Sequence, residues 1–516
     1  YAYLKSTTTP ESVFVDAALT TPATNPVICN SLSAKVFYLD PSKNYDLVAK
    51  TSDDATTLFS VTYNVDANNI TLGAGWEDVL ELPAAGILDN LAGIRSVATY
   101  AALTALTTAT GLSDNGVYYT YARTTEEDGG AGFWRYDSAS TTTANAGTVL
   151  AIDGGGAGRF FRLYNGPLRY EWFSSLTTAL AAASTGLLII STSVAVASNT
   201  SISASLKFEN GGKLVPASSV TVTLSGAIDA DEGVVIFDLA ASSSKITLSG
   251  DNKAVECAWF GGTVSDVGIG VQRAWNAGAR LVNLPRTAVN WTTATTFPQE
   301  FNCTLQGFGS TVFVAANITA ITYLRTSSTD GSTLLIKTNG GWFVETGLGA
   351  TSKLVDFRGY ATGTAPSETN IYNNNTLTID LDGGQMWGFD RITLTKYCAL
   401  IVRNLRAAYN DICFESLRDT SFSTFQKITC VGNGSDIYFA DSTPDGVSNG
   451  LALQQFYSVL ATGANPAIYE KGWQSVIGTT NSIDLCSSGS VCAHFENCDD
   501  MDVSFIWLTS DLTTDS

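Results

Sequence analysis

The clearest hydrophobic pattern lies in residues 254–315, where an apolar pair precedes a helical stretch and several short strands. The pair Trp259 and Phe260 is predicted to end a strand, because a Gly-Gly turn signal follows it. Apolar residues near the helical spacing then predict a helix over residues 267–277, which Gly278 would end. Further short strands are predicted at residues 281–285, 303–305 and 311–314.

A similar pattern occurs earlier in the chain. Trp172 and Phe173 form an apolar pair, and an alanine-rich stretch over residues 176–183 has the spacing of a helix. Strand-like runs follow at residues 186–190, 205–208, 220–224 and 234–239. Because the two apolar pairs occupy equivalent positions, residues 171–253 and 254–315 are predicted to be two copies of one opening module.

Beyond Leu324, short apolar runs alternate with polar turns. The run Asp411-Ile412-Cys413-Phe414 recurs one repeat later as Asp436-Ile437-Tyr438-Phe439. Repeats of this length without helices are typical of a parallel β-helix, in which each rung buries its apolar side chains and stacks on the next. We therefore expect residues 171–516 to form a parallel β-helix, with Ile412, Phe414, Ile437 and Phe439 pointing inward. A β-sandwich or a propeller is the alternative, but neither has a visible signature.

Two smaller β-rich regions precede these repeats. Residues 1–85 contain strand-like runs separated by turn residues, at residues 13–16, 36–39, 45–48 and 58–63. Residues 86–170 combine a stretch with helical spacing, residues 97–108, with a strand and two glycine-rich runs. These runs lack the GxxxxGK[ST] pattern of phosphate loops, which argues against nucleotide binding. The predicted fold class is all-β: a small N-terminal β domain, a β-rich connector with a short helix, and the parallel β-helix.

Two stretches resemble the tailspike and tail fibre proteins of bacteriophages. Residues 15–50 contain Asp16-Ala17-Ala18-Leu19-Thr20-Thr21-Pro22, Asn25-Pro26-Val27 and Tyr38-Leu39-Asp40-Pro41, a series similar to the N-terminal module that attaches these proteins to the virion. A generic small β-sandwich is the alternative for this region. Residues 254–315 are similar to the opening of their pectate-lyase-like domain, although Arg286-Thr287-Ala288 stands where that family has a glycine after the proline.

The resemblance implies an architecture and a set of partners. It implies a right-handed parallel β-helix, a homotrimer, and an N-terminal domain that binds phage tail or portal-adaptor proteins. It also implies that the β-helix recognises a host surface polysaccharide.

Composition limits the partners further. The chain has 516 residues, a net charge of −20 and a pI near 4.4. A nucleic-acid partner would require a basic face, so we expect none. No apolar run approaches the ~20 residues that span a bilayer, so we expect no membrane insertion.

The 9 cysteines are scattered singly, and we expect buried thiols formed in a reducing cytoplasm. The single histidine, His494, lies among Cys486, Cys492 and Cys498, so zinc binding is one reading, although the spacing is not CxxC. We favour a core of stacked thiols and expect no metal and no cofactor. The acidic run at residues 229–232 lacks the spacing of an EF-hand calcium loop.

Carboxylates are the stronger candidates for chemistry. Asp380 and Asp382 are two residues apart on a predicted strand, so they share one face. Their side chains would start ~7 Å apart, from two rises of ~3.3 Å. Glycosidase carboxylate pairs are separated by ~5 to 9.5 Å. Two carboxylates this close tend to have split pKa values, which places one of them in the range of a general acid.

Neighbouring residues complete the predicted site. Glu345 lies one to two rungs earlier and is expected on the same face as a third catalytic carboxylate. Trp387 and Trp342 offer aromatic planes for sugar stacking, and Asp390 is expected to contact substrate with them. A second acidic group consists of Asp390, Asp411, Glu415 and Asp419. The alternative for each of these acids is an outward, solubilising position on the β-helix.

These observations favour a tailspike in the virion tail, assembled in the host cytoplasm and acting at the host cell surface. Its expected activity is endo-acting hydrolysis of lipopolysaccharide O-antigen or capsule. A polysaccharide lyase stays open, because Lys396, Tyr397 and Arg403 would supply a base and neutralise a uronate. Two non-catalytic alternatives are a receptor-binding tail fibre and a structural tail component that uses the β-helix as a spacer.

Overall fold

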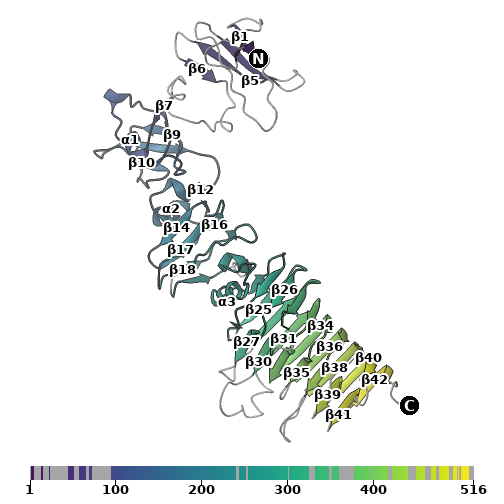
Figure 1. Cartoon of the computed structure of the whole chain (residues 1–516). Coiled ribbons are helices and arrows are strands. Elements are labelled where there is room, and N and C mark those ends of the chain that lie inside the picture. The colour runs from purple at the N-terminus through teal and green to yellow at the C-terminus, as the bar shows by residue number, and fades with distance from the viewer. Residues whose placement is uncertain are drawn as a thin grey trace. The chain divides into compact units, whose positions relative to one another are not determined.

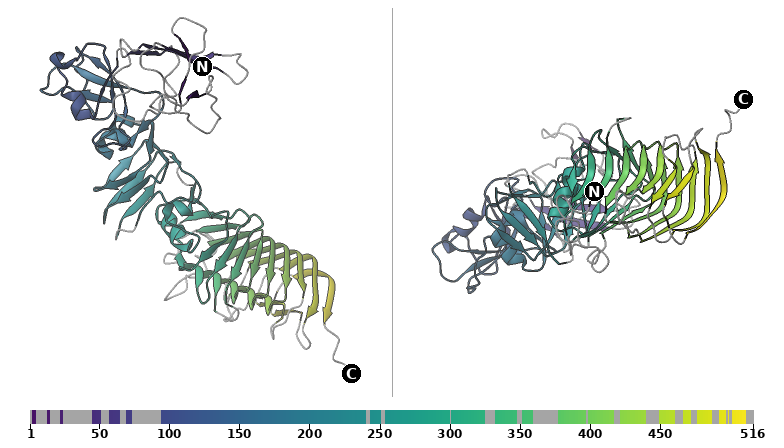
Figure 2. Two further views of the ribbon diagram at one scale, coloured as in Figure 1. Left: turned by 45° about the horizontal axis from the view of Figure 1, so that its top comes forward. Right: turned by 90° about the horizontal axis from the view of Figure 1, so that it is seen from below.

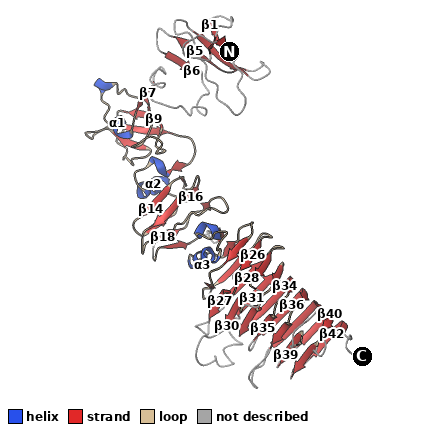
Figure 3. Ribbon diagram, in the orientation of Figure 1, coloured by secondary structure: helices blue, strands red, loops and turns tan. Residues whose placement is uncertain are grey.

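The structure is a computed structural model, and strands dominate it (Figure 3), as the all-β prediction requires. It folds into two compact units, Tyr1–Ala183 and Ser184–Ser516. The predicted domain boundaries at residues 85 and 170 remain predictions. The described residues are 2–4, 13–14, 22–23, 45–50, 57–64, 69–72 and 94–510, the last range with gaps at 240–242, 251–253, 300, 325–331, 348–350, 359–376, 397, 417–420, 440–448, 460–465, 472–475, 487–491, 497 and 499–500.

The first unit begins with an antiparallel sheet in the order β1-β4-β5-β6 and a separate strand pair, β2 with β3. Strands β4 and β5 lie where the sequence predicts them, whereas the predicted strand at residues 36–39 lies outside the described residues. The bounds are β1 (Ala2–Leu4), β2 (Val13–Phe14), β3 (Pro22–Ala23), β4 (Tyr45–Lys50), β5 (Thr57–Asn64) and β6 (Asn69–Leu72).

A second sheet of this unit packs against the short helix α1 (Tyr100–Thr104). Its core includes Leu103, Trp134 and Phe160, all fully buried. The predicted helix over residues 97–108 is longer than the observed one, because Thr99 caps the helix by accepting a hydrogen bond from Ala102 N at 3.3 Å. The strands are β7 (Ile94–Val97), β8 (Val117–Thr120), β9 (Gly132–Asp137), β10 (Val149–Ala151) and β11 (Arg159–Leu163).

The first unit ends with a short strand, β12 (Leu168–Arg169), a 3-10 turn, η4 (Tyr170–Trp172), and then helix α2 (Leu176–Ala183), which confirms the alanine-rich helix. The buried Arg162 guanidinium lies 4.1 Å from the ring centroid of Trp172. It also donates hydrogen bonds to the Gly130 and Ala131 carbonyls. These contacts fix the first apolar pair in place.

The second unit starts with a short coil of parallel strands. Alternate residues such as Leu206 and Phe208 point inward. The predicted strand at residues 234–239 is reduced to one parallel bridge between Phe237 and Leu214, because the Ile236 and Phe237 N–H groups both donate to the Trp259 carbonyl. The strands are β13 (Leu187–Ile190), β14 (Ser193–Val196), β15 (Thr200–Ile202), β16 (Ser205–Phe208), β17 (Lys213–Pro216), β18 (Thr221–Leu224), β19 (Ile228–Asp229) and β20 (Lys245–Leu248).

The second opening module follows this coil. Strand β21 (Ala254–Glu256) ends before the apolar pair, which lies in a 3-10 turn, η5 (Cys257–Phe260), so the predicted strand end at Trp259 and Phe260 is wrong. Helix α3 (Gly268–Asn276) confirms the predicted helix. Gly278, with a φ of +93°, follows the helix as predicted.

The rest of the unit is a parallel β-helix whose rungs each contribute strands to three outer faces (Figure 1). Face A consists of β22 (Leu281–Asn283), β25 (Asn302–Gln306), β28 (Thr333–Lys337) and β31 (Leu377–Asp382). Face B consists of β23 (Val289–Trp291), β26 (Thr311–Val314), β29 (Trp342–Glu345) and β32 (Gln385–Trp387). Face C consists of β24 (Thr295–Thr296), β27 (Thr319–Leu324), β30 (Lys353–Arg358), β33 (Arg391–Lys396), β35 (Ile412–Ser416), β37 (Ser435–Phe439), β39 (Ile468–Lys471) and β41 (Ala493–Glu496).

From β34 onward, faces A and B are built by single long strands. Strand β34 pairs with β31 through its first half and with β32 through its second half. Figure 2 shows these later rungs, in green to yellow, stacked one on the next. The long strands are β34 (Cys398–Ala408), β36 (Ser421–Val431), β38 (Asn449–Val459), β40 (Val476–Cys486) and β42 (Met501–Ser510).

The long strands β34, β36 and β38 each bend at one residue with left-handed backbone geometry. Asn404, Lys427 and Gln455 have φ values of 53°, 54° and 55°. They occupy equivalent places in the register of β34, β36 and β38, so they form one row along the edge between faces A and B. All three side chains are exposed. We call these residues the bend row.

The core is a set of apolar columns that run from rung to rung, ~4.8 Å apart. One column consists of Leu305, Ile336, Leu381, Val402 and Phe425, none more than 1% exposed. Burying such side chains is what stabilises a repeat that cannot fold alone. The predicted parallel β-helix is therefore confirmed.

The four residues predicted to point inward, Ile412, Phe414, Ile437 and Phe439, are buried. Their register differs from the sequence repeat, because Phe414 lies opposite Ile437 and not opposite Phe439. A shift of two residues keeps the same side chains inside.

The described cysteines form no disulfide, and five of them are buried, whereas Cys492 and Cys498 are partly exposed. Thus the prediction of buried thiols holds for five and fails for these two. Among the described residues, no helix is long and apolar enough to cross a membrane.

Candidate functional site

The site is organised by the corner at Gly383 and Gly384, which joins β31 on face A to β32 on face B. Both glycines have positive φ, at 86° and 82°. A Cβ on Gly384 would collide with Thr338 Oγ1 and lie 2.5 Å from the Gly341 carbonyl oxygen, so only glycine fits. The next rung fixes the corner, since Gly383 N donates to the Arg403 carbonyl at 2.8 Å.

Asp380 and Asp382 lie on the outside of face A just before this corner. Ile379 and Leu381 alternate with them and are fully buried, so the two aspartates share one outer face, as the sequence predicts. The predicted separation of the two side chains stays a prediction.

The two carboxylates have different partners. Asp380 forms an ion pair with Arg403 of the next rung. The charge and hydrogen bond of Asp380 raise the pKa of Arg403 above its ordinary value. Asp382 Oδ1 accepts a hydrogen bond from the neutral Asn404 amide at 3.1 Å. The second oxygen of Asp380 is buried without a hydrogen-bond partner among the described residues.

Longer polar side chains extend the site along face A. Lys337, Asp382, Arg403, Gln426 and Gln454 are successive partners in the parallel register of β28, β31, β34, β36 and β38. They form one column of charged and amide groups with a spacing of ~4.8 Å per rung. We call it the polar column.

Three aromatic side chains lie on the outside of face B. The Trp342 and Trp387 rings are stacked, with centroids 6.1 Å apart and an interplanar angle of 20°. Tyr409 of the next rung packs on Trp387 at 4.9 Å, and its side chain is 53% exposed. Trp387 is therefore covered on both ring faces, and Tyr409 is the most open of the three. The structure thus brings the two predicted tryptophans together. Because both ring faces of Trp387 are covered, a ligand would contact mainly the edge of this ring.

The expectation that Glu345 shares the face of the aspartates is wrong. It alternates with the outward residues Trp342 and Val344, and its side chain points inside with 4% exposure. Its Oε1 accepts hydrogen bonds from Gly347 N at 2.8 Å and Ser352 Oγ at 3.2 Å. Glu345 therefore organises the turn after β29.

Asp390 lies next to face C and is bound to a neighbour. It forms an ion pair with Arg391, which also pairs with the buried Glu415. These carboxylates neutralise one arginine, and nothing places Asp390 beside the aromatic rings. Asp411 is exposed, whereas Asp419 and Tyr397 lie outside the described residues.

His494 lies in an aromatic row on the outside of face C. Tyr438 stacks on Tyr469 at 5.0 Å, and His494 packs on Tyr469 at 5.2 Å. Among the described residues, His494, Cys492 and Cys498 do not form a cluster with metal-ligand spacing, and the acidic residues at 229–232 do not either. The described part of the chain therefore gives no support to zinc or calcium binding at these residues.

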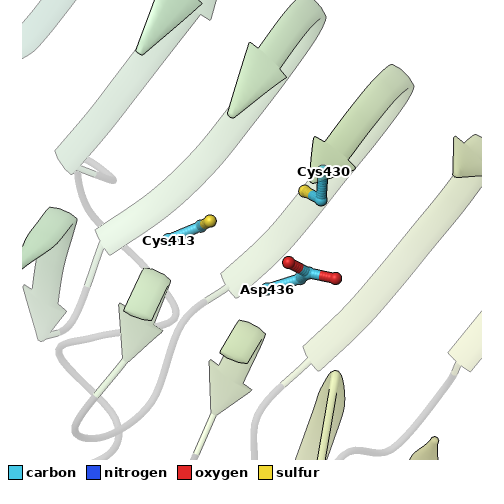
Figure 4. Close-up of side chains that lie close together, drawn as sticks. All are labelled: Cys413, Cys430 and Asp436. Carbon is cyan, nitrogen blue, oxygen red and sulfur yellow. The ribbon is translucent and has the colours of Figure 1, made fainter. Parts of the chain in front are cut away.

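Sequence reasoning did not find a buried cluster of Cys413, Cys430 and Asp436, whose side chains point toward one another (Figure 4). Their ligand atoms lie within 4.8 Å of one another. Asp436 accepts hydrogen bonds from Asn433 Nδ2 at 2.9 Å and from Ser458 Oγ. Structural zinc sites use four ligands and this cluster offers three, already hydrogen-bonded, so we interpret it as a polar core network. Burial raises the pKa of Asp436 to about 6.

Several residues of the outer site were not found by sequence reasoning. Lys337 lies on β28, and Asn404, Arg406 and Tyr409 lie on or just after β34. Only the register brings Lys337 and Asn404 next to Asp382, and Arg406 and Tyr409 next to β32. No local pattern carries that information.

No family model and no curated protein match this chain. Solved structures that resemble it are tailspikes or tailspike-like. Tailspike protein gp49 of the Acinetobacter baumannii bacteriophage Fri1, a capsular polysaccharide depolymerase, is 10% identical with a TM-score of 0.27, over 82% of this chain and 76% of that one. Tailspike protein 2 of the Escherichia coli O157:H7 bacteriophage CAB120 is 11% identical with a TM-score of 0.34, over 85% and 60%.

A third match is the glycan biofilm modifying enzyme WceF of Pantoea stewartii, which has a tailspike-like parallel β-helix. It is 11% identical with a TM-score of 0.20, over 95% of this chain and 57% of that one. The chain thus spans less than two thirds of the second and third of these structures. At such identities and TM-scores the function has to be argued from this chain's own side chains.

Proposed function

We propose that this chain is the receptor-binding tailspike of a bacteriophage, and that it binds and cleaves host surface polysaccharide at the corner between faces A and B. The observation that carries the proposal is the pair Asp380 and Asp382 on one outer face. The Asn404 amide contacts this pair, and the exposed ring of Tyr409 lies beyond the corner on face B; they supply the hydrogen bonds and apolar surface that sugars need.

The neighbours of the two carboxylates favour different roles. Asp380 is paired with the cation of Arg403 and its second oxygen is buried, so it acts as a carboxylate base or nucleophile once this ion pair opens toward the substrate. Asp382 lies between Lys337 and Arg403 in the register but forms no ion pair with a described residue, so it is the carboxyl group that is free to exchange a proton with the leaving oxygen. The reaction is then endo-acting hydrolysis of lipopolysaccharide O-antigen or capsule. Arg403 beside a substrate uronate would instead support a lyase.

The remaining parts of the proposal follow from the predicted N-terminal module. Residues 1–85 attach the protein to phage tail or portal-adaptor proteins, and three copies of the chain form the spike. The protein is then a component of the virion tail that acts at the host cell surface.

The test compares Asp382→Asn and Asp380→Asn with the parent protein on purified bacterial capsules and O-antigens. Each substitution keeps the shape of the side chain but removes proton transfer, so turnover falls by about 10²- to 10⁴-fold. Binding survives, because the aromatic rings and amides are unchanged. Asp229→Asn, an exposed aspartate of β19, is the control and keeps full activity.

The assay measures new reducing ends for a hydrolase and unsaturated uronate ends for a lyase. If the parent cuts and both Asn variants cut equally well, the site lies elsewhere. If the parent binds a polysaccharide but releases neither product, the binding-only function replaces the enzymatic one. The Asp380–Arg403 ion pair favours this binding-only function, because the Asp380 carboxylate is already bound to a cation.

A further inference from the structure

The long strands that build the site differ in charge from the rest of the chain. The whole chain has 48 acidic residues against 28 Lys and Arg. Strands β34, β36 and β38, each of 11 residues, hold Arg403, Arg406 and Lys427 but no aspartate or glutamate. At the average acidic content of the chain, these strands would hold about three acids.

The cations lie on the outside of faces A and B around the corner that follows the two aspartates. Lys337 is the register partner of Asp382 on the preceding rung. Arg406 is exposed on face B, and Lys427 is exposed in the bend row. None of these three forms an ion pair with a residue that the structure describes.

The charges on this part of the surface therefore do not cancel. The ion pair between Asp380 and Arg403 is neutral, and Asp382 contributes one negative charge. The exposed Asp411, two residues from Tyr409, contributes a second negative charge, and Lys337, Arg406 and Lys427 contribute three positive charges. The result is a locally positive surface on a chain with a net charge of −20.

We infer that this surface, which rests on the proposed function, selects a polysaccharide that carries negative charges along its length. Ammonium and guanidinium groups bind carboxylate or phosphate groups, whereas the amides of Asn404, Gln426 and Gln455 bind hydroxyl groups of either kind of sugar. A neutral glycan would use only the amides and the aromatic rings. The cations would then have no ligand.

The experiment measures binding of the full-length protein to purified bacterial polysaccharides of known composition. The panel contains uronate-bearing, phosphate-bearing and neutral polymers. We expect binding to the acidic members of the panel, and we expect it to weaken as salt is added. Salt screens exposed charges beyond a Debye length of ~10 Å at about 0.1 M and ~8 Å at about 0.15 M. Reducing the carboxyl groups of a bound uronate polymer to alcohols is expected to abolish most of that binding. If instead a phosphate polymer binds, and loses binding on removal of its phosphate, phosphate is the charged group.

Variants at the cations give an independent readout. Lys337→Gln, Arg406→Gln and Lys427→Gln each weaken binding by up to about fivefold, the size of an exposed ion pair, and flatten its salt dependence. Lys245→Gln on β20 removes an exposed lysine of the first coil and is the matched control, with no effect on binding. Because all these side chains are on the surface, folding is unaffected and is checked by circular dichroism.

The outcomes separate the two proposals. Binding to a neutral polymer with unchanged affinity in the Gln variants would overturn the inference about charge and leave the proposed function standing. Binding to no polymer of the panel would count against the proposed function itself. Equal loss of binding in Lys245→Gln would show that total charge matters and not this surface, which also overturns the inference.

Discussion

Replacing Asp436 by Asn tests the buried cluster through the pH dependence of stability. Burial raises the pKa of Asp436 from 3.8 to about 6. A carboxyl group with a raised pKa stabilises the fold while it is protonated. That stabilisation is fully present below the unfolded pKa and is lost as the pH rises through the folded pKa. Asn433 and Ser458 can keep hydrogen bonds to an amide, and Asn carries no charge at any pH.

The size of the effect follows from the two pKa values. The difference between 3.8 and about 6 corresponds to about 3 kcal/mol over the whole titration. Between about pH 7.5 and about pH 5 the parent protein gains roughly 1.4 kcal/mol, because pH 5 lies one unit below the folded pKa. Asp436→Asn lacks this gain. The free energy of unfolding of the variant relative to the parent is therefore higher at about pH 7.5 than at about pH 5, by roughly the same 1.4 kcal/mol.

The assay is urea unfolding of both proteins at about pH 5 and about pH 7.5, followed by tryptophan fluorescence. Asp411→Asn is the control, because Asp411 occupies the equivalent place in the preceding sequence repeat and is exposed. Its stability relative to the parent is expected to be the same at both pH values. A pH-independent difference between Asp436→Asn and the parent would refute the burial argument.

Three further predictions use other parts of the chain. Gly384→Ala places a Cβ against Gly341 at positive φ, so we expect a loss of about 1 to 3 kcal/mol in the free energy of unfolding; unchanged urea unfolding would contradict the corner geometry. Ile437→Asp places an unpaired charge in a fully buried position, which is expected to destabilise the fold. A soluble variant with the parent's melting temperature would count heavily against the core described here. A chain truncated to begin at Leu91 is expected to trimerise and to bind host cells, measured by light scattering and a pull-down; a folded truncation that cannot bind would refute the role assigned to residues 1–85.

Patterns carried by neighbouring residues were predictable from the sequence. The helical spacing predicted α2 and α3 to within one or two residues, and the two-residue spacing of Asp380 and Asp382 predicted their common face. The same rule should have excluded Glu345. It is three residues from Trp342, so the two cannot both point outward from one strand.

Contacts between rungs could not be predicted in this way. The ion pair of Asp380 with Arg403 depends on the register of β31 and β34, which are separated along the chain by β32 and β33. Asp436 is equivalent to the exposed Asp411 in the sequence repeat, yet it is buried. In the register Asp436 lies inside β37 opposite the buried Cys413, whereas Asp411 precedes β35.

The bend row has a consequence for how such a protein can diversify. Asn404, Lys427 and Gln455 point away from the apolar columns, and their left-handed backbone is set by the bend of the strand. Asparagine, lysine and glutamine all occupy it, at a cost of about 1 to 2 kcal/mol for a residue other than glycine. Exchanging one polar side chain for another here alters the ligand-facing surface without disturbing the core. The row can therefore change in sequence while the rungs beneath it stay constant.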